Sequence, residues 1–464
     1  MPWPLVALAW VVWLQTSMPC DAGRPAVARQ ALTGSMPGTA SVDLSADGRY
    51  AAFISLARLD PADENAVDDA YVLDRVSGRI SLESLTAEGR ASNGSSEHPR
   101  LSGDGRFVVF ATIASNLMPG SGDARWPQVV RRDRVTGTIV LVSHGPGQQL
   151  ADGWSGDPEI SEDGRYVAFD SRATNLATPG GKGRASDVYL FDAMDGSVRR
   201  VSVTSGGVQP ASGDSTAPAI SGDGRRIVFT STAPLDAVSA SAARGGAPVR
   251  LVFLYDAVTG TTRRISTARD GRAPNGPSYF PTISADGRRV AFVSTATNLA
   301  IDGRAPRQES LYLFDVEGGH LRLASRSATG GAPDGYCRHP ALSGDGRYLA
   351  FSSNASNLAC ADGCAGTDHA DLNLVSDVYR VDTATGAAAR VSGASAREPW
   401  WNASAGAAID DSGRIVAFSS RQPIDEDDLD HDDDLYVEVL PAAAAADAAA
   451  APCGPRDAPA NPPR

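Results

Sequence analysis

The chain has 464 residues, with 55 acidic and 42 basic side chains and a formal net charge of −13. Nucleic acids and anionic membranes both repel an acidic surface, so this balance argues against either as a partner.

The first 18 residues are apolar and interrupted only by Pro, Gln, Thr and Ser. This stretch is too short to predict a membrane span and is typical of the apolar region of a signal peptide. We interpret residues 1–22 as a signal peptide cleaved after Ala22, which predicts a periplasmic or secreted mature chain without a transmembrane span. A lipoprotein anchored through Cys20 is the alternative, although Pro precedes that cysteine.

A short motif recurs seven times along the remainder of the chain. Its core is Ser-x-Asp-Gly-Arg, followed by a run of apolar residues that ends in Phe. Successive copies begin 57 to 67 residues apart, which suits one four-stranded propeller blade per copy. The copies begin at Ser45, Ser102, Ser161, Ser221, Ser284 and Ser343, with a degenerate seventh at Asp410.

The sixth repeat shows how each unit is built. Residues 339–343 form a short first strand, and Asp345-Gly346 supplies the positive φ of a tight hairpin. Residues 347–353 alternate large apolar with small or polar side chains, as a strand does. Residues 377–382 and 387–392 predict the third and fourth strands. The fold class is therefore all-β, a seven-bladed propeller of four-stranded antiparallel blades.

The seventh repeat ends after its third strand, "DLYVEVL" at residues 434–440. The N-terminal segment "AVARQALTGS" at residues 26–35 is similar to the end of the third repeat. We therefore predict that Val27–Thr33 is the outer strand of the last blade, so that both termini close a propeller of residues 23–440. Closure leaves no repeat with an unpaired face. The Ala- and Pro-rich residues 441–464 are expected to be disordered.

Together, the Ser-x-Asp-Gly-Arg strand and the downstream Asp-φ-Tyr-φ-x-Asp and Thr-Gly motifs resemble the WD40-like propeller repeats of TolB-like periplasmic proteins. The resemblance covers residues 26–440 and implies an envelope protein that binds partners. TolB itself has six blades preceded by an α/β domain, and the seven repeats here depart from that plan. This departure weakens the implication of a role in the Tol–Pal machinery.

Three loops between second and third strands carry oxygen side chains at regular spacing, the chemistry that Ca²⁺ prefers. A calcium site is one interpretation, and no other cofactor is expected. The alternative is that these residues cap turns and that the acidic run at residues 425–434 is solvated. The predicted ligands are Asp63, Asn65 and Asp69, then Asp371, Asn373 and Asp377, then Asp428, Asp430 and Asp434.

Aromatic residues are predicted in the loops that enter first strands. Flat rings beside acidic groups suit recognition of a peptide or glycan, whereas plugs packed into the channel mouth are the alternative. The predicted partner-binding residues are Trp154, Tyr279, Phe280, Tyr336, Trp400 and Trp401.

His98 and His339 occupy equivalent positions before the Pro of their first strands, near the channel mouth. They suit a metal or acid–base pair, but the equivalent positions elsewhere hold Asp157, Ala217 and Phe280. We therefore interpret them as ordinary loop residues.

Four cysteines remain in the mature chain: Cys337, Cys360, Cys364 and Cys453. An even number in an exported chain suggests disulfides, with three possible pairings. The topology permits a bond from Cys337 to Cys360 or Cys364, while free thiols or a small loop closed by Cys360 and Cys364 are the alternatives.

No nucleophile elbow is present, so the sequence favours a non-enzymatic, monomeric propeller that binds a protein or glycan partner in the cell envelope. The alternative is a carbohydrate-active enzyme, a lyase or glycoside hydrolase with carboxylates at the channel mouth. An enzyme of this kind should show two carboxylates about 5–10 Å apart.

Overall fold

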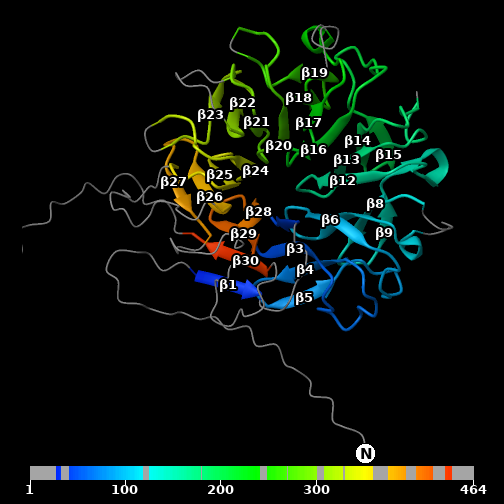
Figure 1. The fold of residues 1–464 in the computed structure, drawn as a ribbon. Helices are drawn as coiled ribbons and strands as arrows, with labels where there is room; N and C mark the ends of the chain where they lie inside the picture. Colours follow the sequence, from blue (N-terminus) through cyan, green and yellow to red (C-terminus); the bar gives the residue numbers. More distant parts are fainter. Residues whose placement is uncertain are drawn as a thin grey trace, which may run out of the picture.

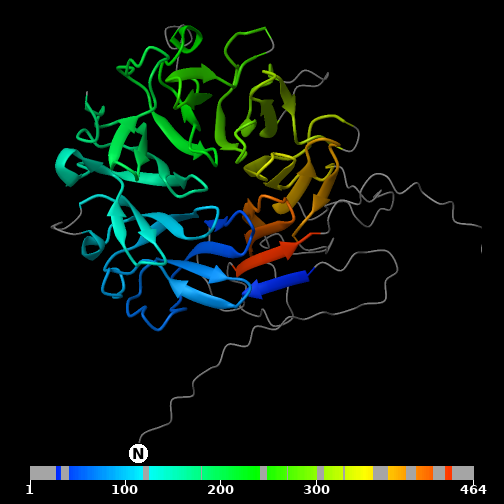
Figure 2. The ribbon, with the colours of Figure 1, turned by 180° about the vertical axis from the view of Figure 1, so that it is seen from behind.

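Seven four-stranded antiparallel sheets are arranged as blades around a central axis (Figures 1 and 2). The structure is a computed structural model and describes residues 28–32, 41–118, 125–178, 180–240, 248–268, 270–299, 308–327, 330–358, 375–392, 404–421 and 434–440. Within these ranges no helix is long or apolar enough to cross a membrane. The predicted all-β, seven-bladed propeller is confirmed.

The first two strands of each blade form a hairpin. The first strands are β2 (Val42–Leu44), β6 (Ser96–Leu101), β12 (Ser155–Ile160), β16 (Ser215–Ile220), β20 (Ser278–Ile283), β24 (Cys337–Leu342) and β28 (Ser404–Ile409). The second strands are β3 (Tyr50–Ser55), β7 (Phe107–Thr112), β13 (Tyr166–Ser171), β17 (Arg226–Ser231), β21 (Arg289–Ser294), β25 (Tyr348–Ser353) and β29 (Ile415–Ser420).

The outer two strands complete each blade. The third strands are β4 (Asp69–Asp74), β8 (Gln128–Asp133), β14 (Asp187–Asp192), β18 (Leu251–Asp256), β22 (Ser310–Asp315), β26 (Asp377–Asp382) and β30 (Asp434–Val439). The fourth strands of blades one to six are β5 (Arg79–Leu82), β9 (Ile139–Leu141), β15 (Ser197–Arg200), β19 (Thr261–Arg264), β23 (Leu321–Leu323) and β27 (Ala388–Arg390). Short elements between β9 and β12 are β10 (His144–Gly145), η2 (Pro146–Gln148) and β11 (Gln149–Leu150), and η1 (Ser115–Leu117) follows β7.

The N-terminal strand β1 (Ala28–Leu32) closes the ring. It is antiparallel to β30 along its whole length, from Leu32 opposite Leu435 to Ala28 opposite Val439. The sheet order of blade seven is accordingly β1-β30-β29-β28, and Figure 1 shows the first and last strands side by side. The predicted closure by the N-terminal strand is confirmed.

In blades one to six each hairpin turn is fixed by the Ser and Asp of the motif, and in blade seven Asp410 takes the place of the serine. In blade two the Ser102 hydroxyl donates to Asp104 at 2.7 Å and accepts the backbone N–H of Phe107 at 2.9 Å. Gly105 has φ of 67°, a conformation that glycine adopts without strain. The repeated motif therefore encodes one hairpin in every blade.

The arginine after the turn also has a repeated partner in five of the seven blades. In blade five Arg288 pairs with Glu317, and in blade seven Arg414 donates to the carbonyl of Leu440. In the other five blades the guanidinium binds the Asp that ends the third strand of the same blade, as in Arg106–Asp133 at 2.8 Å and Arg165–Asp192 at 2.7 Å. These arginines are between a third and a half exposed, so each pair contributes little to stability.

The hydrophobic core consists of seven clusters, one between each pair of neighbouring blades. The cluster at the seam joins Phe53 and Tyr71 of blade one to Ala417 and Leu435 of blade seven. Every blade thus buries both of its faces, which a ring requires of each repeat. The innermost strands are left to form the wall of a channel.

Candidate functional site: the central channel

The seven first strands line the channel, and their hairpin turns are joined in a closed ring at one end. The backbone N–H of Ala46 donates to Gly103, that of Gly103 to Glu162, and the series continues through every blade until Asp411 donates to Ala46, with distances of 2.8 to 3.1 Å. We call this end the hairpin mouth. The opposite end, where the loops between blades enter the first strands, is the loop mouth.

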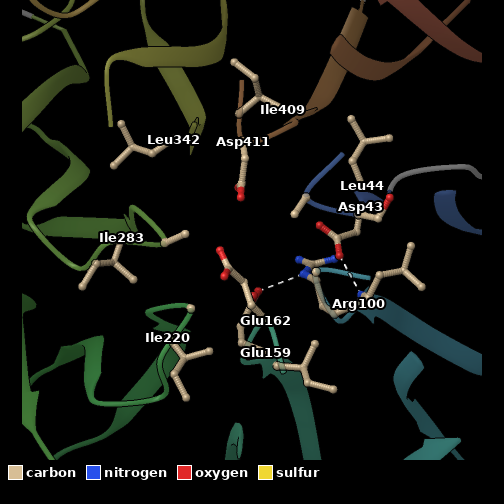
Figure 3. Close-up of a pocket in the computed structure, with 17 residues that line it drawn as sticks. Asp43, Leu44, Arg100, Glu159, Glu162, Ile220, Ile283, Leu342, Ile409 and Asp411 are labelled. Carbon is tan, nitrogen blue, oxygen red and sulfur yellow. Dashed lines mark hydrogen bonds and ion pairs between the residues drawn. The ribbon is translucent and has the colours of Figure 1, made fainter. Parts of the chain in front are cut away.

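At the position before the last residue of each first strand, the channel wall is charged in blades one to three only. Arg100 of β6 donates to Glu159 of β12 at 2.9 Å and to Ser41 at 3.2 Å, while Asp43 accepts the backbone N–H of Leu101 at 2.8 Å. Figure 3 shows these charged side chains gathered at one side of the cavity. The equivalent positions in the other four first strands carry short uncharged residues: Ala219, Thr282, Ala341 and Ala408.

Burial changes the proton affinity of this charged cluster. It raises the pKa of both Asp43 and Glu159, and the nearby Arg100 guanidinium opposes the shift in each case. One arginine between two carboxylates leaves the cluster net negative when both are ionised. The cluster borders a cavity of about 140 Å³ lined by residues of all seven blades.

At the hairpin mouth the lining is acidic. Glu162 and Asp411 point toward one another across the channel (Figure 3). Burial, followed by repulsion from Glu162 and Asp410, raises the pKa of Asp411 to about 6. Asp163, Asp223, Asp286 and Asp345 line the same mouth.

This raised pKa predicts a stability effect that depends on pH. Because the folded chain holds the Asp411 proton more tightly than the unfolded chain, stability falls as pH rises from about 4 to about 6. Asp411→Asn should therefore raise the free energy of unfolding at pH 7.5 by about 1 kcal/mol, after allowing for solvent screening of this exposed group. It should have no such effect at pH 4. Urea denaturation at both pH values measures the difference.

Glu162→Gln supplies the control for that prediction. With the neighbouring charge removed, the gain from Asp411→Asn should shrink, since part of the repulsion is already gone. An equal effect of Asp411→Asn at both pH values would contradict the assignment.

Near the loop mouth the wall carries an unusual backbone feature. Each first strand from β6 to β28 has a bulge, and the residue there has a positive φ. Five of the six are not glycine, although a positive φ is costly for bulky or β-carbon-bearing residues. These residues are His98, Asp157, Ala217, Phe280 and His339, with φ of 45° to 51°, while Gly406 takes the position in blade seven.

The bulges of blades two and three bring an imidazole and two carboxyl groups together. His98 Nδ1 lies 3.0 Å from Asp157 Oδ1, and both side chains are partly exposed. Burial raises the pKa of Asp157, but its interactions with His98, Arg100 and Asp170 together outweigh that effect and lower the pKa. Asp170 is 1% exposed, and burial followed by repulsion from Asp157 raises its pKa well above the usual range. This trio can hold and transfer protons.

The bulges of blades five and six form an aromatic cluster. The Phe280 ring lies 5.0 Å from His339 and 5.4 Å from Tyr279, and Phe280 is 42% exposed. Tyr279 donates its hydroxyl to Glu309, which also pairs with Arg338. Burial, followed by the nearby Arg338, lowers the pKa of His339. The cluster therefore presents an exposed ring that Tyr279 and His339 contact, beside partly exposed polar groups.

The predicted aromatic residues are only partly brought together. Tyr336 stacks with Arg338 at 4.7 Å and belongs to the same cluster as Tyr279 and Phe280. The latter two lie within β20, so their placement in an entering loop was wrong; the apolar-polar alternation of that strand is interrupted by the bulge. Trp154 lies apart, over Arg172 of blade three. Trp400 and Trp401 lie outside the described residues.

His98 and His339 were likewise expected in loops. Both lie inside strands, at the bulges of β6 and β24. Both contact bulge residues of a neighbouring blade, so the interpretation as ordinary loop residues does not hold for either one.

Five of the predicted calcium ligands lie within the described residues, and four lie outside them. In blade one Asp63 accepts the backbone N–H of Asn65 and the Tyr71 hydroxyl, while Asp69 accepts two serine hydroxyls. In blade six Asp377 pairs with Arg390 at 3.3 Å, and in blade seven Asp434 is buried at the start of β30. The other predicted ligands, Asp371, Asn373, Asp428 and Asp430, lie outside the described residues.

Cys337 is a free, fully buried thiol whose Sγ lies 3.4 Å from the Ser353 hydroxyl. Burial raises its pKa to about 11, so the thiol is unreactive at neutral pH. The other three cysteines of the mature chain, at positions 360, 364 and 453, lie outside the described residues.

Comparisons with known proteins support the fold of this chain and do not identify its function. Protein-family models give no match, and curated proteins give none either. Among solved structures, an oligogalacturonate lyase in complex with manganese shares 15% identity over 93% of this chain and 96% of its own, with a TM-score of 0.53. A second oligogalacturonate lyase, from Vibrio parahaemolyticus, shares 14% identity over 93% and 98%, with a TM-score of 0.54.

TolB from Acinetobacter baumannii also matches, with 14% identity over 76% of this chain and 66% of that chain and a TM-score of 0.39. The seven-bladed propeller fold predicted from the repeats is confirmed by the sheet order of this chain. Among the described residues, no group of three or more His, Cys, Asp or Glu is arranged to hold a metal.

Sequence reasoning missed Asp43, Arg100, Glu159 and Asp170. The first three occupy one position of the repeat, immediately before the apolar residue that ends the first strand. Aligning the seven repeats at this position shows charge in blades one to three only, so the signal was available. Asp170 has a different signal, a carboxylate at a strand position where the other blades carry Ile, Ala, Thr, Val or Ser.

Proposed function

We propose that the chain is an exported, non-enzymatic propeller that binds a protein or glycan of the cell envelope at the loop mouth. The observation that carries the proposal is the aromatic cluster of blades five and six, with Phe280 exposed at a positive φ. The N-terminal apolar segment of the sequence supports export. The ring is closed by strands of one chain, which supports a monomer.

The geometry of Phe280 supports binding for a physical reason. An exposed aromatic ring in a strained backbone conformation persists only where the surroundings fix it, and such strain gathers at functional sites. Tyr279 and His339 fix the ring from two sides, so little conformational freedom is lost when a ligand covers it. Glu309 and Arg338 lie beside it and offer hydrogen bonds to hydroxyl or amide groups.

Photo-crosslinking tests this proposal in the cells that produce the protein. With p-benzoylphenylalanine at position 280, we expect one discrete crosslinked product, or in its place binding of the purified chain to a panel of envelope oligosaccharides. The matched control places the same crosslinker at Val258, which is 72% exposed in the turn after β18 on the opposite face. Products of equal yield at both positions, or no product and no glycan bound, would overturn the proposal.

Mutation of Phe280 measures how much its ring contributes to ligand affinity. Phe280→Ala should weaken binding of the identified ligand by about tenfold to hundredfold, as truncation of a central aromatic contact does. Trp126 is also 42% exposed but is not part of the cluster, so Trp126→Ala should leave the affinity unchanged. Calorimetry or surface plasmon resonance measures both.

A carbohydrate lyase is the second candidate, favoured by the His98–Asp157–Asp170 trio. Lyases need a base that removes a proton beside a carboxylate, and an imidazole oriented by a carboxylate can act in this way. The neighbouring Arg100 supplies a positive charge in the same wall. Its test is incubation with oligogalacturonate and other oligouronates: a lyase forms an unsaturated, ultraviolet-absorbing product, and His98→Gln should abolish it.

A further inference from the structure

Four blades begin their third strand with a buried aspartate at the same register position. These residues are Asp69, Asp187, Asp377 and Asp434, all 2% exposed or less. Three of them accept a hydrogen bond from the serine that follows the fourth strand, at 2.5 Å from Ser84, 3.0 Å from Ser202 and 2.7 Å from Ser392. The Asp–Ser hydrogen bond is therefore shared by these blades. They differ in the group that neutralises the negative charge of the aspartate.

Blades three and six balance it with basic side chains. Asp187 lies 2.8 Å from Lys182 Nζ and 3.3 Å from Arg200 Nε, and Asp377 lies 3.3 Å from Arg390. Arg200 and Arg390 share one register position, opposite the tyrosine of the third strand.

Blade one lacks this counter-charge. The residue opposite Tyr71, where the other two blades have arginine, is the buried Leu82. Asp69 Oδ2 has no hydrogen-bond partner within the described ranges of the chain. Asp69 is nevertheless 0% exposed. The Ser84 and Ser92 hydroxyls donate to its Oδ1, but a buried carboxylate that has no basic partner is still unfavourable when it is ionised.

A second buried carboxylate makes the imbalance larger. Asp63 is 5% exposed and contributes repulsion to Asp69. The nearest loop arginine, Arg58, donates to the backbone carbonyls of Asn65 and Glu64 instead of to either carboxylate. Asn65 completes the loop, with its side-chain amide donating to the carbonyl of Ser92.

We propose that blade one binds a hard divalent cation, Ca²⁺, between Asp63, Asn65 and Asp69, where the other blades place lysine or arginine. Carboxylate and amide oxygens are the ligands that Ca²⁺ takes, and it accepts irregular coordination that Mg²⁺ does not. The proposal concerns blade one and not blade six, where Asp377 is already paired with Arg390. It is independent of the proposed binding function at the loop mouth.

The cation would have a structural role. Asp69 also accepts the hydroxyl of Ser92 at 2.9 Å, and Ser92 lies in the connection from β5 to β6. Neutralising Asp69 in this place ties the loop before β4 to the junction between blades one and two, next to the seam of the ring.

Thermal melting and calorimetry of the chelator-treated full chain test the proposal. Adding Ca²⁺ at about 100 times its Kd should raise the Tm by about 2–3 °C through preferential binding to the folded state, with a measurable heat of binding. Mg²⁺ at the same concentration should give a smaller shift. If Ca²⁺ gives neither heat nor a shift, the proposal is wrong.

Variants locate the site. Asp69→Asn keeps an acceptor for Ser84 and Ser92 but removes the charge, so the chain should fold and lose the Ca²⁺ response. Leu82→Arg installs the counter-charge of blades three and six and should also abolish the response. The matched control is Asp187→Asn, which should retain it. Retention in Asp69→Asn, or loss in the control, would overturn the assignment to blade one.

Discussion

Deletion of residues 23–36 is expected to lower the free energy of unfolding by about 5 kcal/mol and to cause aggregation. β1 pairs five residues with β30, and a net gain of about 1 kcal/mol per backbone hydrogen bond gives this order of magnitude. Without β1, the buried strand β30, whose Leu435, Tyr436 and Val437 are 0–2% exposed, becomes an open edge.

Urea denaturation and light scattering measure the two effects. The control removes residues 441–464 from the other end, which should change neither stability nor solubility because the ring is already complete at Leu440. If the N-terminal deletion unfolds at the same urea concentration as the parent, the closure by β1 does not contribute to stability.

Asp187→Ala is expected to cost about 3–5 kcal/mol, the second largest effect. Lys182 and Arg200 are 10% and 5% exposed in their side chains and lie within 3.3 Å of Asp187. Removing the aspartate leaves two buried positive charges without a partner, and breaking a buried pair from one side is strongly destabilising.

The control for this prediction removes all three charges together. In the triple variant Asp187→Ala, Lys182→Met, Arg200→Leu, most of the lost stability should return, because no unpaired charge remains. Chemical denaturation with an unchanged m-value measures both variants. A loss below 1 kcal/mol in the single variant would show that water reaches Lys182 and Arg200.

Asp187 and Asp69 can be compared by how the charge of each buried aspartate is neutralised. Their positions in the fold are equivalent, yet a basic residue accompanies the first and leucine the second. Removal of charge should therefore destabilise blade three in every buffer, whereas in blade one it should destabilise the fold only when Ca²⁺ is present and should stabilise it when Ca²⁺ is absent. The same mutation thus reports on two different ways of neutralising a buried carboxylate.

The charged wall of Asp43, Arg100 and Glu159 and the aromatic cluster around Phe280 come from different blades. The first belongs to blades one to three and the second to blades five and six. A ligand that enters by the loop mouth meets an aromatic surface on one side and the His98–Asp157 pair on the other. Such asymmetry suits recognition of a molecule that has one apolar or sugar face and one polar end.

The sequence by itself determined the number of blades, their four strands and the closure by the N-terminal segment. These features are local. Alternation at period two, an Asp-Gly turn and a fixed repeat can each be recognised from residues that follow one another in the sequence. The missing fourth strand of blade seven also follows from counting, since a ring must pair every strand.

Only the tertiary structure decided which side chains meet. Arg100 reaches Glu159, 59 residues away, because neighbouring first strands converge on the channel. The positive φ of Phe280 comes from a bulge that residue type does not predict, since Phe is not a residue that favours this conformation. The missing counter-charge of Asp69 is visible only when Leu82 is placed opposite Tyr71, because charge balance in a buried site depends on distances between strands rather than on their order in the sequence.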